Sequence, residues 1–172
     1  KTEHIVQDEW IDFRKESFIL PDGKEFSPFY NYSRRNFVVI IAKTKDGKYI
    51  TVRQFRHGLK KVTTEFCAGG IEGSEHESAL LAAKRELEEE TGYISDNWKH
   101  IYTIPSNPTI ADNYAFLYYA DNCEKVSNQH LDSTEFLEVK EYTEDEINDL
   151  IKNNEFVQPI HLMGWLMVKK GV

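Results

Sequence analysis

The chain has 172 residues, a hydrophobic share of 40% and a formal net charge of −8 at pH 7. This length allows one well-buried core, and the acidic balance argues against a nucleic-acid partner, which would need an excess of Lys and Arg. No apolar run approaches the roughly 20 residues of a membrane helix, and the start lacks a signal-peptide pattern, so we expect a cytoplasmic protein without a membrane partner.

The first part of the chain is expected to form strands. The predicted strands cover residues 10–20, 24–33, 36–43, 49–55 and 62–67. Turn residues separate the first four into two hairpins, through Pro21-Asp22-Gly23 and Asp46-Gly47. Gly69 and Gly70 are expected to interrupt the regular structure after the fifth strand.

A helix follows, from about residue 75, where Ser74 and Glu77 form an S-x-x-E capping box. Gly92 is well placed to end it. Beyond it the pattern predicts strands at 98–104, 113–120 and 136–142 and helices at 143–154 and 156–170. The order of strands and helices predicts an α/β fold.

Acidic residues crowd the end of the predicted helix. At 100° per residue, Glu86, Glu89 and Glu90 fall within about a third of its circumference. A neighbouring apolar stripe consists of Leu80, Ala83 and Leu87. A solvated acidic face is one interpretation. Bound divalent cations are the other, and they would relieve both the mutual repulsion and the unfavourable helix dipole.

These residues carry a family resemblance. Glu77, seven residues and then Arg85-Glu86-Leu87-Glu88-Glu89-Glu90-Thr91-Gly92-Tyr93 resemble the E-x7-R-E-U-x-E-E-x-G-U part of the Nudix box, in which U is a bulky apolar residue. Two features depart from the family pattern. Six residues, not five, separate Gly70 from Glu77, and Tyr93 replaces the usual aliphatic residue.

The resemblance implies a Nudix-type α/β/α sandwich with a mixed β-sheet and hydrolysis of a nucleoside diphosphate linked to another group. It also implies that Mg²⁺ or Mn²⁺ is bound by Glu86, Glu90 and Glu89, with the backbone near Gly69 completing a site. Arg85 would orient these acids, and Glu89 would take part in catalysis. For the general base the resemblance points to the loop before the last strand, where Glu135 is the first choice, as base or further metal ligand.

A second segment resembles one subgroup of the Nudix family. VRQFRHGLKKVTTEFCAGGIE is similar to the segment that precedes the box in ADP-ribose and nucleotide-sugar pyrophosphatases, with Cys67 in the place of their usual Pro. Arg53 and Arg56 could then bind phosphates, or could pair with Glu65 or an edge carboxylate. Glu65 could bind a ribose hydroxyl. Pro108 resembles the marker proline of the ADP-ribose members.

The N-terminal strands also resemble a feature of this subgroup. Members of the ADP-ribose type carry such an extension and use it to form a homodimer in which it helps build the partner's adenine pocket. We therefore expect a β extension at residues 1–35 and a Nudix hydrolase domain at 36–172. Candidate stacking or phosphate groups of the extension, each also explained by packing or surface charge, are Trp10, Phe29, Tyr30, Tyr32, Arg34 and Arg35.

Several functions compete with hydrolysis of ADP-ribose to AMP and ribose 5-phosphate. GDP-mannose, ADP-glucose or another sugar nucleotide would change only the substrate. A non-hydrolytic nucleotide sensor is a different class, although such proteins usually have a damaged box. Isoprenoid diphosphate isomerases share the fold but need a nucleophilic Cys in a suitable motif, which neither Cys67 nor Cys123 has. The acidic charge disfavours mRNA decapping, and no histidine is assigned to catalysis.

Overall fold

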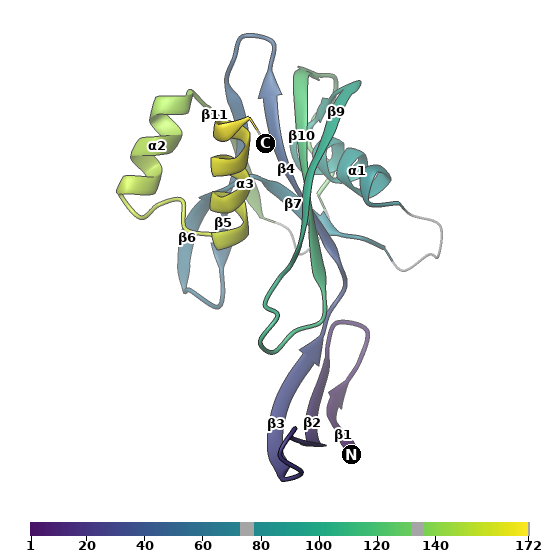
Figure 1. The fold of residues 1–172 in the computed structure, drawn as a ribbon. Helices are drawn as coiled ribbons and strands as arrows, with labels where there is room; N and C mark the ends of the chain where they lie inside the picture. The colour runs from purple at the N-terminus through teal and green to yellow at the C-terminus, as the bar shows by residue number, and fades with distance from the viewer. Residues whose placement is uncertain (73–77, 132–135, 172) are drawn as a thin grey trace.

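A computed structural model describes residues 1–72, 78–131 and 136–171 of the chain (Figure 1). Its strands are β1 (Thr2–Gln7), β2 (Asp12–Ile19), β3 (Glu25–Ser33), β4 (Phe37–Thr44), β5 (Tyr49–Arg56), β6 (Lys61–Glu65), β7 (Cys67–Gly70), β8 (Tyr93–Ile94), β9 (Asn97–Pro105), β10 (Tyr114–Lys125) and β11 (Leu137–Tyr142). Its helices are α1 (Ala79–Thr91), α2 (Glu144–Lys152) and α3 (Pro159–Lys170).

Strands β1, β2 and β3 form a separate antiparallel sheet that projects from the rest of the molecule (Figure 1). It contacts the larger part through the loop 106–113 between β9 and β10. Tyr32 N donates to Ile110 O over 2.9 Å, and Arg14 Nη2 lies 3.2 Å from Asp112 Oδ2. Ser33 donates to the same carboxylate. These bonds fix the loop against the end of β3.

The larger sheet is mixed, as predicted. Its order is β11-β5-β4-β10-β8, with β6 beside β5, β7 beside β4 and β9 beside β10. Only β4 and β10 run parallel among these pairs. Helices cover both faces of β4, and Val38 to Ala42 are fully buried. This burial on both faces explains why the sequence of the strand is a continuous apolar run.

Strands β4 and β5 pair only near their hairpin, at Ala42–Ile50 and Lys43–Tyr49. Farther along they separate, so that β6 pairs with β5 and β7 pairs with β4. Phe66 stands between β6 and β7 and belongs to neither strand. The chain therefore crosses from one half of the sheet to the other at this residue.

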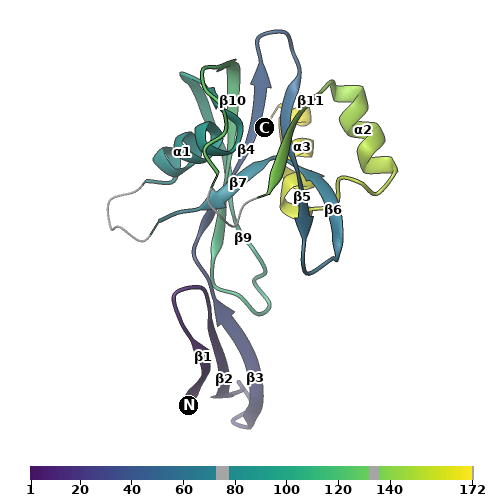
Figure 2. The same ribbon diagram turned by 180° about the vertical axis from the view of Figure 1, so that it is seen from behind.

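The helices cover opposite faces of the sheet (Figures 1 and 2). Val38 and Ile40 of β4 pack in one cluster with Ala83 and Leu87 of α1. Val39 and Ile41 point the other way and pack with residues of α2 and α3, including Trp165. This alternation follows from the two-residue period of a strand. The α/β/α sandwich predicted from the sequence is confirmed.

Several element boundaries differ from the prediction. Strand β1 was not predicted, because its six residues are all exposed and lack an apolar pattern. Gly69 and Gly70 do not interrupt the sheet, since β7 pairs with β4 as far as Gly70–Phe37. The last predicted helix starts later, with Pro159 at its first position, because proline suits the first turn of a helix.

Helix α1 also begins later than predicted. Ser78 has extended backbone angles, and its side chain accepts a hydrogen bond from Leu81 N, so Ser78 is the N-cap. The capping box expected at Ser74 and Glu77 lies outside the described residues. The predicted end is confirmed: Gly92 has a φ of 75°, a left-handed conformation that suits glycine.

Candidate active site

Helix α1 places its glutamates in different environments. Glu86 and Glu90 are 8% and 4% exposed, whereas Glu88 is exposed and Glu89 is half-buried. A spacing of four residues puts Glu86 and Glu90 on the same side of the helix. The interpretation of all these acids as a solvated face therefore does not hold for Glu86 and Glu90.

The backbone of β7 contacts both buried acids. Ala68 N donates to Glu90 Oε2 over 3.2 Å. Glu86 lies so near the next residue that a Cβ built on Gly69 would be 2.0 Å from Glu86 Cδ. Glycine at position 69 is therefore a steric requirement for the observed position of Glu86.

Arg85 connects the helix to the same strand. Its Nη1 lies 2.8 Å from Glu86 Oε1 and 2.9 Å from Glu89 Oε2, and its Nη2 donates to Gly70 O over 3.1 Å. A planar guanidinium can make such bonds in a fixed geometry. The orienting contacts expected of Arg85 toward Glu86 and Glu89 are thus present.

The donors of this site have the chemistry that suits a hard divalent cation. Mg²⁺ and Mn²⁺ prefer carboxylate, carbonyl and water oxygens, and Glu86, Glu90 and the backbone beside Gly69 are such donors. Within residues 1–72, 78–131 and 136–171, no three His, Cys, Asp or Glu side chains form a group that could hold a metal ion. Magnesium in proteins usually keeps several waters and uses one or two carboxylates together with substrate phosphates, which fits this pair.

Two other candidate acids, Glu77 and Glu135, lie outside the described residues. The assignment of Glu135 as general base or metal ligand therefore stays a prediction. Glu89 is described, and its contact with Arg85 places it beside Glu86 at a more exposed position.

Arg56 and Glu65 form an ion pair between β5 and β6. Arg56 Nε donates to Glu65 Oε1 over 2.9 Å, Nη2 also contacts this carboxylate, and Thr63 donates to it. Burial acts to raise the pKa of Glu65, but the hydrogen bonds from Arg56 and Thr63 outweigh burial and lower it. The charged carboxylate is thereby stable at a fully buried position.

The same pair is electrostatically connected to the glutamate helix. The hydrogen bond that Arg56 donates to Glu65 is the largest cause of the raised pKa of Arg56, burial opposes it, and the charges of Glu65 and Glu90 add to the increase. Arg56 therefore lies within electrostatic reach of Glu90. This placement suits an arginine at the edge of a phosphate site.

The other two substrate-binding candidates lie in different surroundings. Arg53 Nη1 is 3.7 Å from Glu138 Oε2 on the neighbouring strand β11, the alternative pairing with an edge carboxylate. Pro108 is exposed in the loop 106–113. Besides its internal hydrogen bonds, this loop makes hydrogen bonds to the N-terminal sheet, at Tyr32, Ser33 and Arg14.

His161 is a further residue connected to this region, and the sequence did not indicate it. His161 is 4% exposed, and its Nδ1 accepts a hydrogen bond from Phe66 N over 3.2 Å. Burial lowers the pKa of His161 to about 4. No local pattern could have revealed this contact, because the two residues are 95 positions apart.

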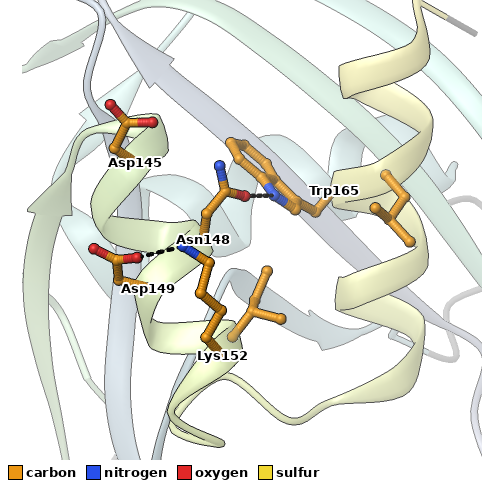
Figure 3. A pocket seen from close by; sticks show the side chains of 7 residues that line it. Asp145, Asn148, Asp149, Lys152 and Trp165 are labelled. Carbon is orange, nitrogen blue, oxygen red and sulfur yellow. Dashed lines mark hydrogen bonds and ion pairs between the residues drawn. The ribbon is translucent and has the colours of Figure 1, made fainter.

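Two surface depressions lie away from the buried glutamates. One, between α2 and α3, is lined by residues that include Asp145, Asn148, Asp149, Lys152 and Trp165 (Figure 3). Trp165 Nε1 donates to Asn148 Oδ1 there, over 3.1 Å. The other lies at the β5–β6 hairpin and includes Arg56, His57 and Lys61. The second depression adjoins the candidate site through Arg56.

Comparison with known proteins agrees with this geometry. A model of the NUDIX domain family matches residues 32–161. The chain is 33% identical to the ADP-ribose pyrophosphatase of Bacillus subtilis, over 99% of this chain and 92% of that protein. It is also 33% identical to the methanol dehydrogenase activator of Bacillus methanolicus, over 88% of this chain and 81% of that protein.

Two further likenesses are more limited. The chain is 33% identical to an ADP-sugar pyrophosphatase of Mus musculus, over 53% of this chain and 45% of that protein. A crystal structure of an ADP compounds hydrolase superposes with a TM-score of 0.83 and 18% identity, covering 99% of this chain and 90% of that one. At this identity the superposition shows the fold, including the N-terminal sheet within the matched length.

Proposed function

Since the chain belongs to the NUDIX domain family, we propose that it hydrolyses the diphosphate bond of ADP-ribose or a related nucleoside diphosphate sugar. The products would be AMP and a sugar phosphate. The observation that carries this proposal is the buried pair Glu86 and Glu90, held against β7 by Ala68 N, Gly69 and Arg85. The likeness to the B. subtilis ADP-ribose pyrophosphatase supports the substrate class.

The proposed metal ligands are Glu86 and Glu90, with the backbone at Gly69. Glu89 is proposed as a third ligand that would have to leave Arg85 and move toward this pair, because the described residues contain no ready group of three acids. Mg²⁺ or Mn²⁺ bound there supplies charge neutralisation on the diphosphate and a water activated for attack at neutral pH. Arg85 holds Glu86 and Glu89 in fixed orientations, and Ala68 N holds Glu90. Glu89, and Glu135, which precedes β11 in the sequence, are the candidates for accepting the proton of the attacking water.

The proposed substrate contacts come from β5, β6 and the loop 106–113. Glu65 holds one edge of the Arg56 guanidinium, at Nε and Nη2, and Nη1 is the proposed donor to a phosphate oxygen. Arg53 is a second phosphate candidate once it leaves its exposed partner Glu138. Glu65 and Pro108 complete the proposed set, as a ribose contact and as part of the loop over the sugar.

The N-terminal sheet is proposed to serve dimerisation. The exposed large apolar side chains of this sheet and its connections are Ile5, Val6, Trp10, Phe18, Ile19, Phe26 and Tyr30. Apolar surface of this kind is typical of an interaction site. We therefore propose that residues 1–35 form a homodimer contact and pocket element on the hydrolase domain of 36–172.

The cytoplasmic location and the absence of a nucleic-acid partner stay predictions. No described helix is long and apolar enough to cross a membrane.

Two alternatives remain distinct from this proposal. GDP-mannose or ADP-glucose as substrate would leave the glutamate chemistry unchanged and alter only the pocket. A non-hydrolytic nucleotide sensor would bind the same ligands without turnover. The intact acids of α1 and the bridging Arg85 favour the enzyme.

The deciding experiment incubates the purified protein with ADP-ribose, ADP-glucose, GDP-mannose or NADH, in Mg²⁺ and separately in EDTA. Products are separated by chromatography and identified by phosphorus NMR. Metal-dependent release of AMP, fastest from ADP-ribose, is expected. Preferential cleavage of GDP-mannose or ADP-glucose would change the substrate, and binding without turnover of any compound would establish the sensor instead.

A further inference from the structure

The crossing residue Phe66 is held by a helix on the far face of the sheet. Its N–H donates to His161 Nδ1 on α3 over 3.2 Å, and both residues are buried. Its ring packs against Phe156 and Trp165, with centroid distances of 5.0 and 5.9 Å. An Nδ1 atom that accepts must be unprotonated, so His161 is the neutral tautomer with its proton on Nε2.

Phe66 joins the two groups of contacts that form the candidate site. Immediately before it, Glu65 holds Arg56. Immediately after it, β7 supplies Ala68 N to Glu90, the close approach of Gly69 to Glu86, and Gly70 O to Arg85. A displacement of the backbone at Phe66 therefore moves the phosphate side and the carboxylate side of the site relative to each other.

We propose that His161 is a positioning residue, which fixes the Phe66 backbone and thereby sets the geometry of the metal and phosphate contacts. This inference rests on the proposed function, since it assigns His161 a role in that site. A buried N–H left without its acceptor is costly, so the backbone at Phe66 would shift to find another. Small misplacements of reacting groups reduce rates strongly.

Two neutral substitutions separate positioning from simple stability. In His161→Asn the side-chain carbonyl oxygen takes the place of Nδ1 and can still accept from Phe66 N. In His161→Gln the amide reaches the place of Nε2, so this acceptor is lost. Both changes leave a smaller or reshaped side chain in the core and lower Tm. His100→Gln, at an exposed position, serves as the control for replacing a histidine.

The first measurement is the Kd for Mn²⁺ in the absence of substrate. It is made by water-proton relaxation at a temperature below the Tm of every variant. We expect His161→Gln to weaken binding about 10-fold, as loss of supporting contacts around a metal does, while His161→Asn stays within about twofold of the starting protein. The same ranking is expected in kcat, with KM less affected. Equal Kd values for Asn and Gln, or no Mn²⁺ binding by the unmodified protein, would overturn the inference.

The second readout uses the unmodified protein and needs no variant to fold. Nitrogen-15 NMR of the histidine rings at pH 7 is expected to show His161 neutral and protonated at Nε2. Protonation at Nδ1 would overturn the inference, because the hydrogen bond from Phe66 could not then exist. Neither the Kd for Mn²⁺ nor the tautomer of His161 depends on turnover. A protein that binds Mn²⁺ but cleaves no nucleotide sugar would refute the proposed function, and these two measurements would still test the role of His161.

Discussion

The carboxylate of Glu86 occupies the space into which a side chain at position 69 would project. A Cβ on Gly69 would lie 2.0 Å from Glu86 Cδ and 2.2 Å from each of its oxygens. Because Gly69 has no side chain, the buried carboxylate of Glu86 can contact the backbone of β7 directly. Gly70, one position later, has nothing within 4 Å of the same built atom.

This contrast predicts different effects of two alanine substitutions. Gly69→Ala should displace Glu86 and weaken Mn²⁺ binding about 10- to 100-fold, whereas Gly70→Ala should leave the Kd nearly unchanged. Mn²⁺ titration followed by water-proton relaxation measures both. Equal affinities would show that Glu86 can move without loss of the metal site.

Glu90→Gln should abolish most turnover while the protein stays folded. The amide keeps the size of the side chain and an oxygen that can accept from Ala68 N, but it removes the negative charge. We expect kcat to fall about 100-fold or more, measured as AMP release from ADP-ribose. Glu88→Gln, on the exposed side of α1, is the matched control and should keep its activity. Comparable loss in both variants would contradict the assignment.

Glu65→Gln should destabilise the fold, because it leaves the guanidinium of Arg56 without its buried counter-charge. Loss of one partner of a fully buried pair costs about 3–5 kcal/mol, and since the Arg56 side chain is 35% exposed, we expect about 2 kcal/mol. Urea unfolding at pH 7 gives this free energy. Glu138→Gln breaks the exposed contact with Arg53 and should not change the transition measurably; a similar loss in both would refute the distinction.

Stability should fall when the pH is lowered from about 6.5 to about 4. His161 has a pKa near 6.5 when unfolded and about 4 when folded. Between these values the unfolded chain binds more protons, so acid favours unfolding, by on the order of 3 kcal/mol. The lowered pKa of Glu65 acts in the same direction, but only below about 4.5.

The measurement is the unfolding free energy of the unmodified protein and of His161→Asn across this pH range. The variant lacks the titrating ring, so its curve should be flatter between pH 6.5 and 4.5. Parallel curves would show that His161 is protonated as easily in the folded protein as in the unfolded chain.

Local patterns predicted the parts of the site that belong to one element. The spacing of Glu86 and Glu90 on one face of α1 and the end of that helix at Gly92 follow from the period of a helix and the conformation of glycine. The pairing of Arg56 with Glu65 was one of two open interpretations, and a hairpin brings these residues together across β5 and β6.

Contacts between distant elements could not be predicted in this way. The bond of Phe66 to His161 and that of Ala68 to Glu90 depend on how helices pack on the sheet. The sequence also suggested that Gly69 and Gly70 end the regular structure. The role of Gly69 depends instead on the position of Glu86 in the folded chain, since glycine in a strand can mark a close approach of another group.

The loop 106–113 is held by residues from the beginning of the chain. Asp112 accepts from Arg14, 98 positions earlier, and from Ser33, 79 positions earlier. A chimaera that receives residues 1–35 from a relative would bring new neighbours to Asp112 and to Pro108 in the same loop. A chimaera should therefore exchange residues 106–113 together with the N-terminal segment, because the side chains of the two segments contact each other and must match.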